Sequence, residues 1–162
     1  MTVQPEIGNV LIRSAGRADI AALLEFRLAM MAELFPGDEQ PVPEAEALRR
    51  LSETWIVDHL GRDFAAWIVD LDGVPVATAG VIWFEHPPGP INPIGREAYL
   101  LNVYTVPEAR RLGLARKLVQ RIVEEARFAG VRRIWLRASE AGRPLYSELG
   151  FRESNYLQLA AD

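Results

Sequence analysis

The chain has 162 residues, of which 49% are hydrophobic and 25% charged, with a formal net charge of −4. It contains no cysteine and two histidines, which excludes disulfides, a thiolate nucleophile and a convincing zinc site, so we expect no metal. Because no apolar run is long enough to cross a membrane and no basic arm suggests nucleic acid, we expect one cytoplasmic globular domain, residues 1–162.

Hydrophobic periodicity and turn residues divide the chain into alternating helices and strands. Asp72-Gly73 predicts a tight hairpin between two strands, and Gly61 and Gly130 follow two helices as C-terminal glycines. In chain order the expected elements are a strand over 10–13, helices over 17–35 and 43–60, strands over 64–71, 74–85 and 99–106, a helix over 115–129, a strand over 134–138, a helix over 141–149 and a strand over 155–160. This order, β-α-α-β-β-β-α-β-α-β, predicts a mixed α/β (α+β) architecture.

The most informative segment joins the strand that ends at Val106 to the long helix. Gly113 has no Cβ and lets a ligand approach the backbone, and the first N–H groups of a helix favour an anion. Arg110, Arg111 and Arg116 add positive charge around the same turn. The segment therefore predicts a pyrophosphate site; the alternative is a turn glycine beside solvated charges.

Two motifs resemble those of a known family. Arg110, Gly113 and Ala115 fill the pattern Arg/Gln-x-x-Gly-x-Gly/Ala, which is the acetyl-coenzyme A signature of the GNAT superfamily of N-acetyltransferases. Further along, Leu145-Tyr146 followed by Gly150-Phe151 is similar to the ending of the same fold. The resemblance extends from residue 10 to residue 159.

The resemblance implies a GNAT fold, with a mixed central sheet of six to seven strands flanked by about four helices. In that fold the fourth strand carries a bulge and parts from the fifth, and the pantetheine arm of acetyl-CoA lies in the gap. Main-chain N–H groups of the fourth strand meet the thioester carbonyl. The residues that the resemblance places against the cofactor are Val103, Tyr104, Thr105, Val106, Arg110, Arg111, Leu112, Gly113, Leu114, Ala115, Arg116, Ser139 and Tyr146.

Tyr146 is the candidate general acid. A phenol is protonated at neutral pH and can give its proton to a departing thiolate, and the resemblance places this tyrosine near the sulfur; the alternative is a packing tyrosine. Ser139 stands where many relatives have asparagine. The base is open: Asn102 stands where many relatives are acidic and cannot itself take a proton, so a water held by Asn102, Tyr104 or Glu85 is the alternative.

The resemblance implies an acetyl-CoA-dependent N-acetyltransferase whose acceptor is the primary amine of a small or amino-acid-like molecule. Residues 1–80 carry 13 acidic and 6 basic side chains, against 9 and 12 in residues 81–162. This balance suits an amine acceptor and a phosphate-bearing cofactor; the alternative is that the charges belong to solvated helix faces. The alternatives are a protein lysine or N-terminal amine, a hydroxyl acceptor, and a non-catalytic acyl-CoA-binding module. A homodimer is a further expectation, based on the large side chains of Trp55, Trp67 and Trp83, with Ile56 and Phe84; the alternative is that these residues belong to the core.

Overall fold

The computed structural model describes residues 8–36 and 44–159. Its elements are β1 (Val10–Ser14), the 3-10 helix η1 (Arg17–Asp19), α1 (Ile20–Leu34), α2 (Ala45–His59), β2 (Phe64–Leu71), β3 (Val74–Glu85), β4 (Arg96–Thr105), the 3-10 helix η2 (Pro107–Ala109), α3 (Leu114–Phe128), β5 (Ile134–Leu136) and α4 (Arg143–Glu148). The order confirms the predicted one as far as α4. Two predicted element ends, Pro43 and Ala160, lie outside the described residues.

The five strands form one sheet in the order β1-β2-β3-β4-β5. The pairs from β1 to β4 are antiparallel, and β5 joins β4 in parallel after the crossover through α3. Asp72 and Gly73 turn β2 into β3 with φ of 52° and 81°, as a two-residue hairpin with two left-handed positions requires. The crossover brings the turn before α3 to the end of β4.

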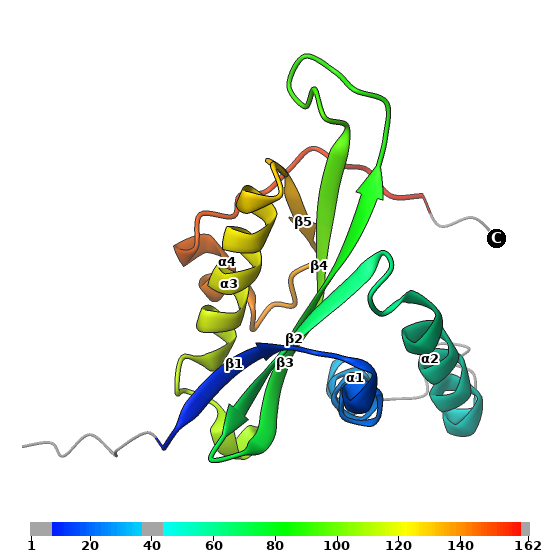
Figure 1. Ribbon diagram of the computed structural model, residues 1–162, viewed down its shortest axis with the longest axis vertical. Helices are drawn as coiled ribbons and strands as arrows, with labels where there is room; N and C mark the ends of the chain where they lie inside the picture. Colours follow the sequence, from blue (N-terminus) through cyan, green and yellow to red (C-terminus); the bar gives the residue numbers. More distant parts are fainter. Residues whose placement is uncertain (1–7, 37–43, 160–162) are drawn as a thin grey trace, which may run out of the picture.

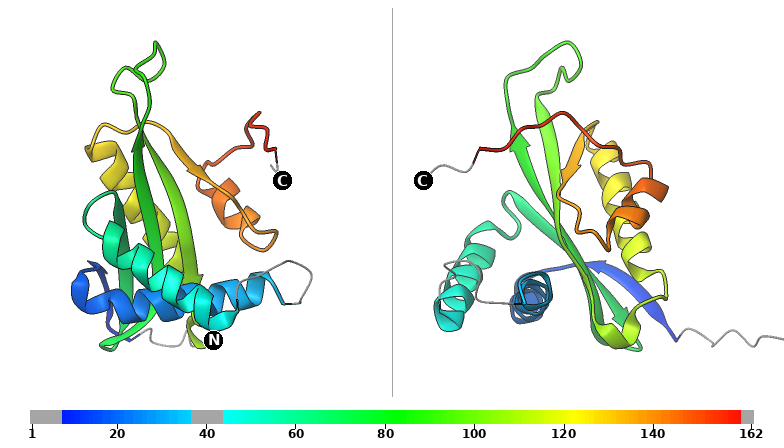
Figure 2. Two further views of the ribbon diagram at one scale, coloured as in Figure 1. Left: turned by 90° about the vertical axis from the view of Figure 1, so that its right-hand side faces the viewer. Right: turned by 180° about the vertical axis from the view of Figure 1, so that it is seen from behind.

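Helices cover both faces of the sheet, and each face has its own hydrophobic cluster (Figures 1 and 2). One cluster lies under α3, and its buried helix residues are Leu114, Leu118, Val119, Ile122 and Ala126. The other lies under α1 and α2 and is built around Leu23, Leu24, Ile56, Phe64 and Ile68. The buried stripe of α3 follows the 3.6-residue period of an amphipathic helix. The two faces of β4 therefore look onto different layers of helix.

β4 carries a bulge at Asn102. The register of β3 against β4 shifts between Thr78 and Gly80, so that one extra residue of β4 is accommodated there. Asn102 has a φ of 52°, a left-handed conformation that asparagine tolerates better than most residues. Side-chain alternation also breaks, because Leu101 and Asn102 both face α1 while Val103 packs on the α3 side. This confirms the bulge expected in the fourth strand.

β4 and β5 part just before this bulge. Their pairing covers only Ala98–Leu100 on β4 and Ile134–Leu136 on β5. Beyond Leu100, no described strand pairs with β4 on its β5 side. The edge of β4 that follows is therefore open, as the resemblance implied for the pantetheine gap.

The last predicted strand, over 155–160, is wrong in its described part, and the sheet of described residues has five strands rather than six or seven. Figure 2 shows the chain after α4 crossing the sheet instead of running along β5. Tyr156 packs its ring against Trp135, with centroids 4.2 Å apart. Leu157 and Leu159 are 98% and 89% exposed. Alternating apolar residues do not form a strand where no hydrophobic surface receives them.

Candidate active site

The turn between β4 and α3 presents main-chain N–H groups. Arg111 and Gly113 both have left-handed backbones, with φ of 67° and 74°. Gly113 is the N-cap of α3, and no side chain of the described residues caps the helix. Because α3 opens with the hydrogen bond from Lys117 N to Gly113 O at 3.1 Å, the N–H groups of residues 114–116 have no partner within the helix. Such a helix end, with its dipole, favours an anion.

A cavity of about 470 Å³ opens at this end of α3. Leu145 of α4 and Ala141, two residues before this helix, also line this cavity. A Cβ added at Gly113 would meet no heavy atom within 4 Å, so the glycine leaves space for a ligand at the cavity wall. Of the predicted cofactor residues, those that line the cavity are Thr105, Arg110, Arg111, Gly113, Leu114, Ala115 and Arg116. The structure thus brings the two sequence motifs together.

Two of the arginine side chains around the turn are engaged with the protein itself. Arg110 donates to both carboxylate oxygens of Glu33, at 2.7 and 2.8 Å. Arg116 forms an ion pair with Glu148 of α4, whereas the side chain of Arg111 is exposed. These ion pairs connect α1 and α4 to the turn. Because the two guanidinium groups already have partners, an anion at the turn would be bound chiefly by main-chain N–H groups.

Four apolar residues predicted to touch the cofactor have packing roles. Leu114 is buried and Leu112 packs against the same cluster under α3, so both offer a ligand little beyond their main chain. Val103 and Val106 pack on the α3 side of the sheet. The N–H of Val106 donates to the carbonyl of Val76 at 2.9 Å, and this donor is therefore not free to meet a thioester carbonyl.

Tyr104 and Thr105 connect β4 to the end of α1. The Tyr104 hydroxyl donates to Glu33 at 3.0 Å, and the Thr105 carbonyl accepts from Arg110 Nε at 2.9 Å. Burial, together with the neighbouring Glu33 carboxylate, raises the pKa of Tyr104. This phenol stays protonated and already has its acceptor, which makes it a poor base.

Tyr146 lies on α4, and its hydroxyl forms no hydrogen bond within residues 8–36 and 44–159. Its ring packs edge-on against Phe151, with centroids 5.7 Å apart, and burial raises the pKa of Tyr146, with no hydrogen bond within the described residues contributing to the shift. At the entry to α4, Ser139 Oγ accepts the N–H of Gly142 at 3.2 Å. Tyr146 is therefore a protonated donor, and Ser139 helps to shape the turn that places it.

Asn102 faces a polar cluster on the α1 side of the bulge. Its Oδ1 accepts a hydrogen bond from Arg27 Nη1 at 2.8 Å, and Arg27 Nε donates to Ser52 Oγ at 3.3 Å. The three residues come from β4, α1 and α2. Sequence reasoning did not find Arg27 or Ser52, because no local pattern links residues so far apart.

Glu85 lies away from the bulge. It ends β3, opposite Arg96, and its side chain is exposed. It lies six positions along β3 from Ala79, beside the bulge, which corresponds to on the order of 20 Å along a strand. The structure therefore does not bring Glu85 to Asn102 or Tyr146.

A buried carboxylate at the other end of β4 was also missed. Glu97 is 2% exposed and meets His86 Nε2 at 2.9 Å, Asn92 Nδ2 and Arg133 Nη1 at 3.3 Å each, and the Trp135 indole. Burial opposes its ionisation, yet the hydrogen bonds hold the pKa of Glu97 below its usual range. The backbone carbonyl of Pro87 and the Glu97 carboxylate both raise the pKa of His86. This cluster fastens the loop over 86–95 to β4 and β5.

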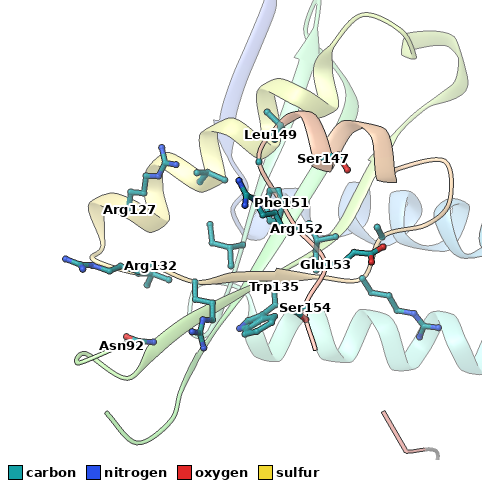
Figure 3. Close-up of a pocket in the computed structure, with 18 of the residues that line it drawn as sticks. Asn92, Arg127, Arg132, Trp135, Ser147, Leu149, Phe151, Arg152, Glu153 and Ser154 are labelled. Atoms are coloured by element: carbon teal, nitrogen blue, oxygen red, sulfur yellow. The ribbon is translucent and has the colours of Figure 1, made fainter. Parts of the chain in front are cut away.

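A larger cavity, of about 1410 Å³, lies along β5 between α3, α4 and the C-terminal segment (Figure 3). Trp135 and Glu153 line it, and Arg127 and Arg132 lie at one end. It borders β5, for which the structure gives no strand partner other than β4 among the described residues. We assign the active site to the smaller cavity, because the uncapped helix end and the start of the tyrosine-bearing α4 meet there.

Three further predictions concern metals, membranes and oligomers. Within residues 8–36 and 44–159, no group of three acidic or histidine side chains is arranged to hold a metal ion. No helix in these ranges is long and apolar enough to span a membrane. Two of the residues cited for a dimer, Ile56 and Trp67, lie in the core with 1% and 7% exposure. The homodimer stays a prediction.

Comparison with known sequences adds a family match and a partial relative. The model of the acetyltransferase (GNAT) family matches residues 28–151. The chain is 41% identical over 61 residues to the ribosomal protein bS18 alanine N-acetyltransferase of Escherichia coli K12. That match covers 36% of this chain and 41% of the enzyme, so it spans less than half the length of this curated relative.

Solved structures resemble the whole described fold. A predicted acetyltransferase from Clostridium acetobutylicum, crystallised with acetyl-CoA, has a TM-score of 0.78 and 29% identity over 94% of this chain and 96% of that chain. A GCN5-related N-acetyltransferase from Ralstonia eutropha JMP134 has a TM-score of 0.83 and 24% identity over 94% and 99%. The second similarity supports the fold alone.

Proposed function

Because this chain belongs to the acetyltransferase (GNAT) family, we propose that it transfers the acetyl group of acetyl-CoA to the primary amine of a small or amino-acid-like acceptor. In this proposal residues 1–162 act as one domain, and the amine attacks the thioester directly in a ternary complex. No cysteine is present to carry the acyl group. The observation that carries the proposal is the uncapped helix end at Gly113, beside the open edge of β4.

The residues around the turn fit a pyrophosphate. Two left-handed residues and the free N–H groups of the first turn of α3 form a concave set of donors. The space at Gly113 allows a phosphate to reach them. We place the pyrophosphate on the main chain of 113–116, with Arg111 adding charge from the solvent side. The open edge of β4 after the bulge, over 103–105, would accept the pantetheine arm.

The Tyr146 phenol is the proposed general acid. Acetyl-CoA, when bound, supplies an activated acyl carbon and a thiolate leaving group. The raised pKa of Tyr146 keeps its proton available at neutral pH, and this proton passes to sulfur as the C–N bond forms and the C–S bond breaks. Asn102 keeps the backbone in its bulged conformation and helps to orient the acceptor. It takes up no proton, so the first proton of the acceptor ammonium leaves to water before the amine attacks. The second proton, which the nitrogen loses on becoming an amide, passes through water to the Tyr146 phenolate and restores the phenol.

A protein N-terminal amine is the second candidate acceptor. The partial similarity to an enzyme named for acetylating the alanine of a ribosomal protein favours it. An N-terminal alanine resembles a small amino acid in its amine and differs in having no free carboxylate. Peptides therefore belong in the same test as free amines.

Two measurements test the proposal. Calorimetry should show one acetyl-CoA bound per chain, and thiol release should appear with at least one member of a panel of amino acids, simple amines, a peptide with N-terminal alanine, a lysine peptide and an amino alcohol blocked at nitrogen. Binding without thiol release from any acceptor would point to a non-catalytic acyl-CoA module. No binding at all would overturn the assignment of the turn.

A further inference from the structure

Arg27 lies where three elements, α1, α2 and β4, meet on the α1 side of the sheet. It lies in the middle of α1, and its guanidinium reaches Asn102 at the bulge and Ser52 on α2, at 2.8 and 3.3 Å. Asn102 is also the residue at which β4 departs from regular geometry, just after its pairing with β5 ends. An acceptor that approaches the open edge of β4 from the α1 side would therefore meet Arg27.

The charge of Arg27 is incompletely compensated. Both of its hydrogen-bond acceptors are neutral oxygens, and no carboxylate lies within 4 Å of it among residues 8–36 and 44–159. Burial lowers the pKa of Arg27, whereas carboxylate partners raise the pKa of Arg13, Arg49 and Arg110. A guanidinium does not lose its proton in proteins, so the half-buried charge persists and favours an anion beside it.

The guanidinium also has donors to spare. Of its five N–H groups, Nη1 and Nε each use one for Asn102 and Ser52, so three remain without an acceptor in the part of the chain that the structure describes. A planar fork of this kind binds a carboxylate through two parallel hydrogen bonds. The two neighbours in this cluster are uncharged, so a single positive charge is offered, which matches a carboxylate better than a phosphate dianion.

We propose that Arg27 binds a carboxylate of the acceptor, so that the favoured acceptors are amino acids or amines that carry a carboxylate. This inference rests on the proposed function, since it assigns the acceptor of that same reaction. Arg27 acts as a specificity residue: it holds the acceptor by its carboxylate and leaves the amine to face the open edge of β4.

The test compares matched acceptors that differ only in charge. Amino acids with the amine at increasing distance from the carboxylate are each paired with the corresponding carboxamide, which keeps the size and removes the charge. For the best pair, kcat/KM of the wild-type protein should favour the carboxylate by about tenfold to a hundredfold, the range of a bidentate charge-assisted contact. Arg27→Met should reduce this ratio to near unity, mainly by raising KM for the carboxylate.

Two variants control this comparison. Arg49→Met removes an exposed arginine that pairs with Glu25 on the outer side of the same helices, and it should leave the ratio unchanged. Arg27→Lys keeps the charge without the planar fork, and it should retain part of the preference. If Arg27→Met does not fold, the wild-type ratio and the lysine variant still decide the question.

The outcomes separate this inference from the function on which it rests. Equal use of carboxylates and carboxamides by the wild type, or a ratio that survives in folded Arg27→Met, would overturn the role of Arg27 while leaving amine acetylation intact. A stronger preference for amines with a phosphate ester would overturn the choice of carboxylate. Failure of the proposed function would look different, because no amine of any charge would then release thiol.

Discussion

The two faces of β4 differ in how they would recognise a ligand. On the α3 side, the hydrogen-bond donors are main-chain N–H groups of the turn at Gly113. The nearby Arg110 and Arg116 form ion pairs with Glu33 and Glu148. On the α1 side, the proposed recognition of the acceptor uses the side chain of Arg27, which is held by Asn102 and Ser52. A main-chain site suits a cofactor whose phosphates never vary, whereas a side-chain site can be changed by one substitution to suit another acceptor.

The largest expected effect is on turnover from the α3 side. Tyr146→Phe should lower kcat by about a hundredfold if proton transfer to sulfur limits the rate, the usual contribution of a general acid. The dissociation constant for acetyl-CoA should stay nearly unchanged, because the ring keeps its packing against Phe151. Steady-state kinetics across the pH range and calorimetry measure the two quantities. Wild-type turnover at every pH would make Tyr146 a packing residue.

Gly113→Val should break the main-chain site itself. The side chain would enter the space at the cavity wall, and the dissociation constant for acetyl-CoA should rise about tenfold or more as one or two charge-assisted hydrogen bonds are lost. The φ of 74° also strains valine. Gly61→Val is the matched control, because Gly61 has a φ of 85° and equally open surroundings at the end of α2. If Gly113→Val and Gly61→Val had comparable melting temperatures and Gly113→Val bound acetyl-CoA as tightly as the wild type, the turn would not be part of the cofactor site.

Arg110→Met sharpens the contrast between main chain and side chain. Because Arg110 already pairs with Glu33 in an exposed ion pair, its loss should change acetyl-CoA affinity by less than about threefold. Arg111→Met should cost more, and its effect should shrink with added salt because the charge is exposed. Calorimetry at two salt concentrations compares the variants. A large, salt-independent loss in Arg110→Met would show that its side chain, and not the backbone, binds the phosphates.

The smallest effect concerns the buried cluster of Glu97 and His86. Disrupting this cluster should change the stability of the fold and leave the binding of acetyl-CoA and of the acceptor unchanged. The lowered pKa of Glu97 stabilises the fold above its ordinary value of 4.5, and this contribution is lost as pH falls through the folded pKa. The raised pKa of His86 stabilises it below 6.5, and this contribution is lost as pH rises through the folded pKa. Melting temperatures of wild type and His86→Gln should therefore differ most between about pH 4.5 and 6.5. A difference independent of pH would argue against this ion pair.

Local signals in the sequence determined most of the fold. The hairpin strands 64–71 and 74–85 have the predicted bounds, because Asp72-Gly73 prescribes both left-handed turn positions. The long helix is displaced by one residue from its prediction. Gly113 lies at the entry to the long helix, as predicted, and its φ of 74° is one that glycine adopts without strain. The anion site there stays a prediction.

Which partners the charged and apolar side chains contact was decided by the tertiary structure alone. The cluster of Arg27, Ser52 and Asn102 joins three elements, so no spacing within the sequence could reveal it. The same holds for Arg110. Its charge suggested that it binds a phosphate, but in the structure its side chain donates a hydrogen bond to Glu33. The last expected strand failed because pairing needs a surface to cover its apolar side, and the exposed leucine at 157 has none. Backbone conformation is set by local sterics, whereas partners of charged and apolar side chains are set by the packing of distant segments.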